Sequence, residues 1–298
     1  MRCKLPDEKT IKDLAREISK KMGLKNIEKY TKDFVPLFIL DGMRTGSSLK
    51  GKDAYLDGAD FGKKFIFIHK ILGGRNIYLH LSGEFHAKER ENYPDIYAAF
   101  MEEAKEWVEL VSKHGIRPRF FGNFEDFLSP DSSSDLRPYM KKLEELGSNN
   151  NFNVYVQLNY STEWAMKMGL DYFKEFPEVN VVIRPTKGQG VPGQVFIPGK
   201  IQNYTFVYVQ QGSCDSTWSL RQLVTLYLVC LKAMVHNFYL FTSDREKYDE
   251  NKREGMKKLR EIDAVFIDKD IYDEKLNDGK KSKVAVIFSE VGPERYTF

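Results

Sequence analysis

The sequence is poor in cysteine, and its charges are nearly balanced. Its three cysteines, Cys3, Cys214 and Cys230, are too few for a disulfide framework and lie too far apart for a metal-binding spacing. The 46 Lys and Arg residues stand against 43 Asp and Glu residues, so the net charge is only +3. A nucleic-acid-binding domain usually carries a basic stripe or a pI above about 9. These absences argue against a disulfide-rich secreted protein and against nucleic acid as a partner.

Long apolar runs are missing as well. No stretch approaches the roughly 18 consecutive apolar residues of a membrane span. The segment after Cys3 is too polar for the apolar part of a secretory signal. Hydrophobic residues nevertheless make up 42% of the chain, which is enough for a sizeable core. We therefore expect a globular protein of the cytoplasm.

The sequence does contain an alternation of strands and helices. The continuous apolar runs at 35–40 and 179–184 are typical of strands that are buried on both faces of a parallel sheet. Four further strands are predicted at 76–81, 117–122, 153–158 and 204–209. Helices are predicted at 8–22, from Pro94 onward, and at 136–146, 162–174, 217–236 and 244–262.

This alternation predicts the α/β class. Parallel strands need long crossover connections, and helices supply them. We expect a single central, mostly parallel six-stranded sheet with helices on both faces. Two short strand-like runs at 264–267 and 283–288 are expected to belong to a C-terminal appendage. The charged helix at 244–262 is expected to present a solvated face.

Polar residues follow several of the predicted strands. In parallel sheets, ligands bind beyond the carboxyl ends of the strands. The loop at 41–50 combines small residues and hydroxyls with Arg44 and Lys50, and such groups suit phosphate oxygens. Asp41 could hold Mg²⁺ against the same phosphates. An ordinary solvent-exposed turn is the alternative interpretation of these residues.

Two other patterns have a functional and a structural interpretation. Gly188, Gly190 and Gly193 have the spacing of a dinucleotide fingerprint, but Pro192 and the apolar residues after it predict no helix to receive a pyrophosphate. A shaped loop is the preferred interpretation. His80, Glu84 and His86 could form a zinc site if the strand alternation continues to His86. The alternative is a pair of ordinary histidines.

Several segments together resemble one known family. The stretch VPLFILDGMRTG (35–46) resembles the first strand and phosphate loop of the cis-prenyltransferases, the undecaprenyl diphosphate synthase family. Four further segments match the family in the same order, namely 78–85, Pro94 through 127, 151–161 and 178–185. The similarity covers about 30–240. It implies a single cis-prenyltransferase-like domain over 1–298 with its core at about 30–240 and a C-terminal extension at 241–298.

The resemblance implies an enzyme of isoprenoid biosynthesis. In that family Mg²⁺-bound isopentenyl diphosphate attacks C1 of an allylic diphosphate. By the resemblance, Asp41 holds Mg²⁺ and the allylic diphosphate, Ser82 and Glu84 lie near the reacting centre, and Arg184 grips isopentenyl diphosphate. The loop residues expected at the diphosphate are Gly42, Arg44, Thr45, Gly46 and Ser47.

The resemblance also implies a hydrocarbon site and partners. The long helix lines a hydrocarbon tunnel in the family, so Tyr97, Phe100 and Met101 are expected either to face a prenyl tail or to belong to the core. The family is usually dimeric, so we expect a homodimer. A lipid product implies a possible peripheral contact with a membrane.

The sequence departs from the family pattern at several of its polar positions. Met43 and Thr45 stand where the family has Asn and Arg, and Phe85-His86 replaces Asn-Trp. After Arg184, the second arginine and Ser-Asn of the family are replaced by PTKGQGVPGQVFIPGK (185–200). The late glutamate of the magnesium site is also missing. Two alternatives to an atypical cis-prenyltransferase therefore stay open. One is a terpenoid synthase that ionises the allylic diphosphate and then cyclises or rearranges it, and the other is a catalytically silent isoprenoid-binding or partner subunit.

Overall fold

The computed structural model describes residues 4–40, 49, 51–89, 91–127, 135–184, 195–210, 219–241, 265–266 and 285–289. Its strands are β1 (Pro36–Ile39), β2 (Asn76–His80), β3 (Ile116–Phe121), β4 (Phe152–Gln157), β5 (Val179–Arg184), β6 (Ile201–Gln210), β7 (Val265–Phe266) and β8 (Ala285–Ser289). Its helices are α1 (Glu8–Lys21), α2 (Ile27–Thr31), α4 (Lys52–Ile71), α5 (Glu84–Glu89), α6 (Tyr93–His114), α7 (Arg137–Leu146), α8 (Thr162–Met168), the short 3-10 helix η1 (Leu170–Phe173) and α9 (Leu220–Phe241).

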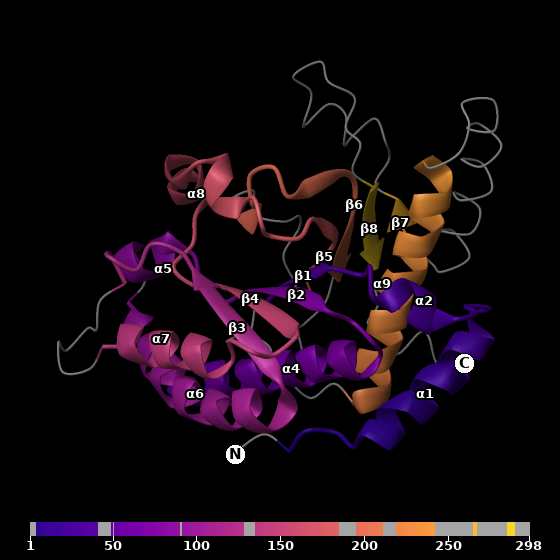
Figure 1. Ribbon diagram of the computed structural model, residues 1–298, viewed down its shortest axis with the longest axis horizontal. Helices are drawn as coiled ribbons and strands as arrows, with labels where there is room; N and C mark the ends of the chain where they lie inside the picture. Colours follow the sequence, from indigo (N-terminus) through magenta and orange to yellow (C-terminus); the bar gives the residue numbers. More distant parts are fainter. Residues whose placement is uncertain are drawn as a thin grey trace.

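The strands form one sheet in the order β3-β4-β2-β1-β5-β6-β8-β7 (Figure 1). All neighbouring strands are parallel except β7, which runs antiparallel to β8. The five strands β1 to β5 form a parallel unit that carries most of the polar strand ends. The α/β class and the mostly parallel sheet are thus confirmed, and each of the six predicted strands is present.

The two strand-like runs expected in the C-terminal appendage join the central sheet as β7 and β8, so the described sheet has eight strands rather than the six expected. β8 pairs with β6 in parallel, with Phe206 opposite Ala285 and Gln210 opposite Ser289. β7 then pairs with β8. An apolar strand at the edge of a sheet gains hydrogen bonds when another strand covers it, which explains why these runs extend the sheet. The charged helix predicted at 244–262 lies outside the described residues.

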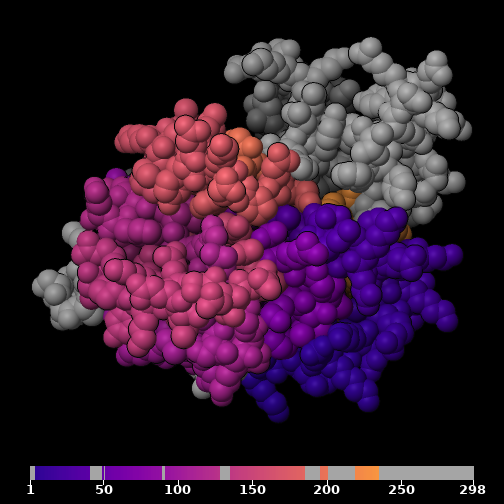
Figure 2. Space-filling view, in the orientation of Figure 1, coloured from indigo at the N-terminus to yellow at the C-terminus, as the bar shows by residue number. Residues whose placement is uncertain are grey.

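Helices cover both faces of the sheet, as predicted. One face packs against α4, α6, α7 and α9, and α1 packs in turn against α4 and α9; this face buries Phe38, Leu79 and Val156. The other face buries Leu37, Tyr78 and Tyr155 beneath α8 and η1. In the space-filling view, the chain around α8 and η1 stands out above the body of the molecule (Figure 2).

The helix α4 was not predicted from the sequence. It is buried around most of its circumference, because the sheet, α6 and α9 all pack against it, and its buried residues include the charged Lys63, so the periodicity of an amphipathic helix is weak. At Gly62 the helix approaches the end of β1 closely, since a Cβ there would lie 2.7 Å from the Leu40 side chain. The start of α5 at Glu84 was not predicted either. The helix predicted at 162–174 is divided into α8 and η1 at Gly169, which has a φ of 80°.

The strand order places a topological switch point at β1. The first crossover leads from β1 to β2 on one side, whereas β5 returns to pair with β1 on the other side. In open α/β sheets such a point opens a crevice at the carboxyl ends of the strands.

Among the described helices, none combines the length and apolar character that crossing a bilayer requires.

Candidate functional site

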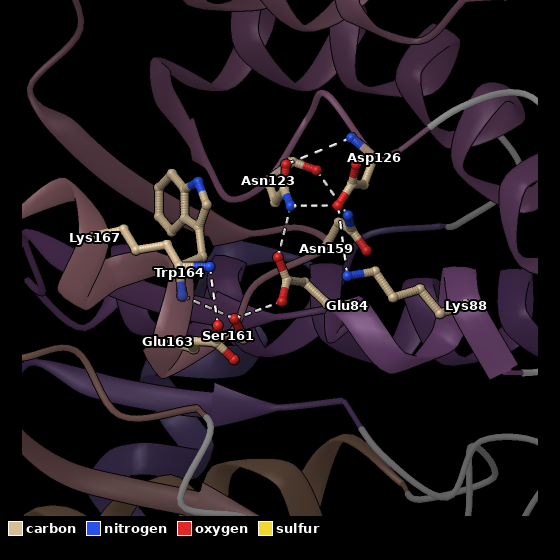
Figure 3. A network of polar contacts seen from close by, with 9 residues as sticks. All are labelled: Glu84, Lys88, Asn123, Asp126, Asn159, Ser161, Glu163, Trp164 and Lys167. Carbon is tan, nitrogen blue, oxygen red and sulfur yellow. Dashed lines mark hydrogen bonds and ion pairs between the residues drawn. The ribbon is translucent and has the colours of Figure 1, made fainter.

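Polar residues from three neighbouring strand ends meet at the carboxyl edge of the sheet. β3, β4 and β2 are adjacent and parallel, so the residues after them emerge side by side. Ser82 and Glu84 follow β2, Asn159 and Ser161 follow β4, and Asn123 follows β3. Figure 3 shows the network that most of these side chains form.

The carboxylate of Glu84 lies at the centre of this network. Asn123 Nδ2 donates to its Oε1 at 2.7 Å, and Ser161 Oγ donates to its Oε2 at 2.7 Å (Figure 3). The residue is half-buried. Hydrogen bonds to an ionised acceptor are short and about twice as strong as neutral ones. Each carboxylate oxygen is therefore held by a donor from a different strand end.

Asn123 connects Glu84 to a second carboxylate. Its Nδ2 also donates to Asp126 Oδ2 at 2.8 Å, and Lys88 Nζ lies 3.5 Å from the same oxygen. The backbone of Asn123 is fixed by Asn159, because Asn123 N donates to Asn159 O at 3.0 Å and Asn159 Nδ2 donates to Asn123 O at 2.7 Å. The turn after β3 is therefore joined rigidly to the end of β4.

Ser161 is at the same time the N-cap of α8. Its Oγ accepts a hydrogen bond from Trp164 N at 3.0 Å, and its backbone is extended, as N-cap residues usually are. The hydroxyl proton of Ser161 is therefore available for the hydrogen bond to Glu84. One side chain thus begins a helix and binds the carboxylate.

Ser82 supports the strand end next to it. It is 1% exposed, and its Oγ accepts a hydrogen bond from Asn159 N at 2.9 Å. Asn159 has a left-handed backbone with a φ of 50°, which asparagine tolerates better than most residues. Its Oδ1 is buried and has no hydrogen-bond partner among the described residues.

Gly122 makes this close approach possible. Its φ is 150°, and a Cβ at this position would lie 1.8 Å from Leu158 O. No other residue fits without moving β3 or β4. The turn at 122–126 therefore depends on a glycine directly before Asn123.

The predicted phosphate loop begins at the same edge. Leu40 N donates to His80 O at 3.1 Å, so the chain leaves β1 beside the end of β2. Asp41, Gly42, Arg44, Thr45, Gly46 and Ser47 themselves lie outside the described residues. Arg184 is the last residue of β5, on the other side of β1 from Glu84, and it is half-buried.

The predicted tunnel residues lie on α6. Tyr97 is buried, its ring centroid lies 5.3 Å from that of Phe127, and its hydroxyl oxygen accepts from Leu136 N at 3.1 Å. Phe100 also contacts the Phe127 ring, with 6.0 Å between centroids, and Met101 is partly buried against the core. These contacts place the three residues in packed surroundings, and their part in a hydrocarbon tunnel stays a prediction.

The helices α4 and α6 hold a second group of acidic residues. The carboxylates of Asp60, Glu103 and Glu106 have oxygens within 4.8 Å of one another, which is close enough for a metal ion. The ammonium of Lys63, whose side chain is 1% exposed, lies 2.7 Å from Asp60, 3.0 Å from Glu103 and 2.7 Å from Glu106. The cluster therefore already contains a cation that belongs to the protein.

Burial and mutual attraction change the pKa values in this cluster. Burial raises the pKa of Glu103 to about 7, although Lys63 opposes the shift. Burial alone would lower the pKa of Lys63, but the charge of Glu103 and hydrogen bonds to Asp60 and Glu106 raise it above its ordinary value. Lys63 is therefore held as an ammonium group.

The zinc alternative at His80, Glu84 and His86 does not find support in the described residues. The three side chains have other partners: His80 Nδ1 lies 3.2 Å from Gln157 Oε1, and His86 Nδ1 accepts from Gly83 N at 2.9 Å. Within the part of the chain that the structure describes, the acidic group on α4 and α6 is the one whose ligand atoms come together.

Comparison with known proteins supports the fold. No protein-family model matches the chain, and no curated protein matches it. A lavandulyl diphosphate synthase from Lavandula x intermedia, solved in complex with dimethylallyl diphosphate, has a TM-score of 0.55 and 13% sequence identity over 68% of this chain and 95% of its own. A probable undecaprenyl diphosphate synthase from Campylobacter jejuni has a TM-score of 0.48 and 12% identity over 66% of this chain and 93% of its own. At this identity, the first of these similarities shows a shared fold.

Proposed function

We propose that the chain is an atypical cis-prenyltransferase that binds an allylic isoprenoid diphosphate at the carboxyl edge of the sheet. The observation that carries the proposal is the carboxylate of Glu84, held at this edge by Asn123 and Ser161 beside the strand that leads to Asp41. The shared fold with a diphosphate synthase that was solved with dimethylallyl diphosphate supports the substrate class.

The proposed diphosphate site is the loop after β1. Asp41, Gly42, Arg44, Thr45, Gly46 and Ser47 offer backbone amides, hydroxyls and one guanidinium group, which suit phosphate oxygens. Arg184, across β1, is the proposed group for the diphosphate of the second substrate. A bidentate arginine binds such oxygens with defined geometry.

Magnesium is the proposed cofactor. Mg²⁺ prefers oxygen ligands, and the described edge offers the carboxylates of Glu84 and Asp126 and the amide oxygen of Asn159. These donors suit the ion, and Asp41 is the residue proposed to hold it. When bound, Mg²⁺ would neutralise charge on the leaving diphosphate. The acidic cluster on α4 and α6 is not proposed for this role, because Lys63 already occupies it.

Glu84 has a chemical role in this proposal. As the bond between C1 of the allylic group and the diphosphate breaks, its electron pair leaves with the diphosphate and positive charge develops on the carbon. A carboxylate whose orientation is fixed beforehand stabilises such charge without reorganising. Ser82 contributes by holding the end of β4 through Asn159.

The segment after Arg184 favours a second candidate. The family residues expected at 185–200 to grip isopentenyl diphosphate are replaced. A terpenoid synthase that ionises the allylic diphosphate and cyclises or rearranges the cation does not need that grip.

The test is a product assay with matched variants. The wild-type chain, Asp41→Ala and the control Asp171→Ala, an exposed aspartate of η1, are incubated with Mg²⁺ and allylic diphosphates of five to twenty carbons. Each incubation is run with and without isopentenyl diphosphate. We expect elongated products from the wild type and from Asp171→Ala, and their loss in Asp41→Ala.

The other outcomes separate the candidates. Release of diphosphate without isopentenyl diphosphate would support the terpenoid synthase. No turnover with any pair of substrates, together with equal binding of dimethylallyl diphosphate by the wild type and Asp41→Ala, would contradict both enzymes and leave a silent subunit.

A further inference from the structure

The orientation of Glu84 does not come from its own helix. Glu84 begins the short helix α5 directly after Gly83, and a glutamate side chain has several rotatable bonds whose restriction costs conformational entropy. Its carboxylate is instead held by two donors that are 39 and 77 residues away in the sequence. Figure 3 shows them on different sides of the carboxylate.

Asn123 is suited to hold two carboxylates at once. An asparagine amide nitrogen has two protons, and here one serves Glu84 and the other serves Asp126. An aspartate at this position would have no donor when ionised and would repel both neighbours. The reciprocal hydrogen bonds with Asn159 fix the backbone of Asn123, so its side-chain amide is already positioned beside both carboxylates.

Ser161 holds the second oxygen from the opposite side. Its Oγ accepts from Trp164 N and donates to Glu84, so its hydroxyl proton has one direction to point. Glu84 is consequently fixed between the turn after β3 and the start of α8. A movement of either element would turn the carboxylate.

We propose that Asn123 and Ser161 are positioning residues that aim Glu84 at the reacting carbon of the allylic diphosphate. This inference rests on the proposed function. Neither residue is proposed to touch the substrate, and both act through Glu84. Their loss should therefore lower kcat and leave KM for the allylic diphosphate nearly unchanged.

A double-mutant cycle tests the inference. Asn123→Ala should lower kcat about tenfold, the effect of one hydrogen bond to a charged group. In a Glu84→Ala background the same substitution should lower kcat by less than about twofold, because its target is gone. Asn150→Ala is the matched control, since Asn150 Nδ2 also makes two hydrogen bonds, to Val111 O and Ile116 O, and neither involves Glu84. Any effect of Asn150→Ala should be the same in both backgrounds.

Three further variants protect the test against misfolding. Asn123→Asp keeps the shape of the side chain and removes the donor. Ser161→Gly removes the hydroxyl with little cost to the N-cap, and Ser161→Thr should restore activity. Urea unfolding of each variant shows which of them fold and are used in the cycle.

The possible results distinguish the inference from the function on which it rests. Equal losses of kcat with and without Glu84 would overturn the positioning role and leave the proposed function intact. A rise in KM with unchanged kcat would overturn it as well, because that result indicates direct substrate binding. A wild-type chain without turnover would overturn both.

Discussion

At the scale of single residues, His69 shows how burial selects one protonation state. The side chain is completely buried, with Nε2 2.9 Å from Asn76 O and Nδ1 3.0 Å from the hydroxyl of Tyr227. A carbonyl oxygen only accepts, so Nε2 carries the proton and Nδ1 accepts from the tyrosine. Burial lowers the pKa of His69 from 6.5 to about 4.

This shift predicts a loss of stability in acid. Between pH 6.5 and 4, His69 is protonated in the unfolded chain but stays neutral in the folded chain. The free energy of unfolding therefore falls as the pH falls through this window. The loss amounts to about 3 kcal/mol. Urea unfolding at pH 7 and pH 4 should show it, and His69→Gln should reduce the difference. A pH dependence that His69→Gln leaves unchanged would contradict the assignment.

Gly122 predicts a second effect at this scale. Gly122→Ala places a Cβ against Leu158 O, and its φ of 150° is strained for any other residue, so we expect a loss of at least about 3 kcal/mol. The control is Gly169→Ala, which shares a positive φ of 80° but has nothing within 4 Å of the new Cβ. Its loss should be about 1 kcal/mol. Urea unfolding measures the loss of stability in both variants. Equal losses would show that backbone strain, and not the contact with Leu158 O, determines the cost of the substitution.

At the scale of elements, the contact between α4 and α6 contains more negative than positive charge. Three carboxylates surround one ammonium, and Glu103 is the most buried of the three. Removing the ammonium would leave buried carboxylates without a counterion. Lys63→Met is therefore expected to destabilise the fold by roughly 3–5 kcal/mol.

Glu103 makes this contact sensitive to pH. Its pKa rises from 4.5 in the unfolded chain to about 7 in the folded chain, so the folded state binds more protons between these values. The contribution of Glu103 to stability is therefore full below pH 4.5 and is lost as the pH rises through 7. Glu103→Gln should remove this dependence, as seen by thermal unfolding between pH 5 and 8. The exposed Glu145→Gln is the control and should follow the wild type.

The elements also show what the sequence could and could not predict. Buried strands appear as continuous apolar runs, so all six were found. The helix α4 was not found, because its buried part includes charged residues such as Lys63 and its apolar positions do not form one clear stripe. The expectation that Ser82 and Glu84 lie together at the end of β2 followed from the resemblance of segment 78–85 to the family. Asn123 and Ser161 were not named as site residues, because their contact with Glu84 depends on the register of β2, β4 and β3 rather than on local spacing. Polar residues in the short segment that follows each buried strand were the signal that could have found them.

At the scale of the whole molecule, the C-terminal strands protect the sheet. β8 pairs along β6 from Phe206 to Gln210, and β7 covers β8 in turn. A chain that ends at residue 241 would leave β6 as an uncovered apolar edge, and such edges promote aggregation. We expect this truncated chain to lose monodispersity in size-exclusion chromatography. A soluble truncated chain with the elution volume of a compact protein would contradict this role.

The predicted homodimer belongs to this scale too. Sedimentation of the full chain across a range of concentrations measures it, and a single species with the mass of one 298-residue chain would contradict the prediction. Peripheral contact with a membrane also stays a prediction.

The central position of β1 divides the candidate site into two parts. Glu84, Asn123 and Ser161 follow β2, β3 and β4 on one side, whereas Arg184 ends β5 on the other. Substitutions in groups that do not touch usually have independent effects. The two sides of the candidate site can therefore change independently of each other. A substitution at Arg184 is therefore expected to leave the hydrogen bonds of Glu84 to Asn123 and Ser161 unchanged.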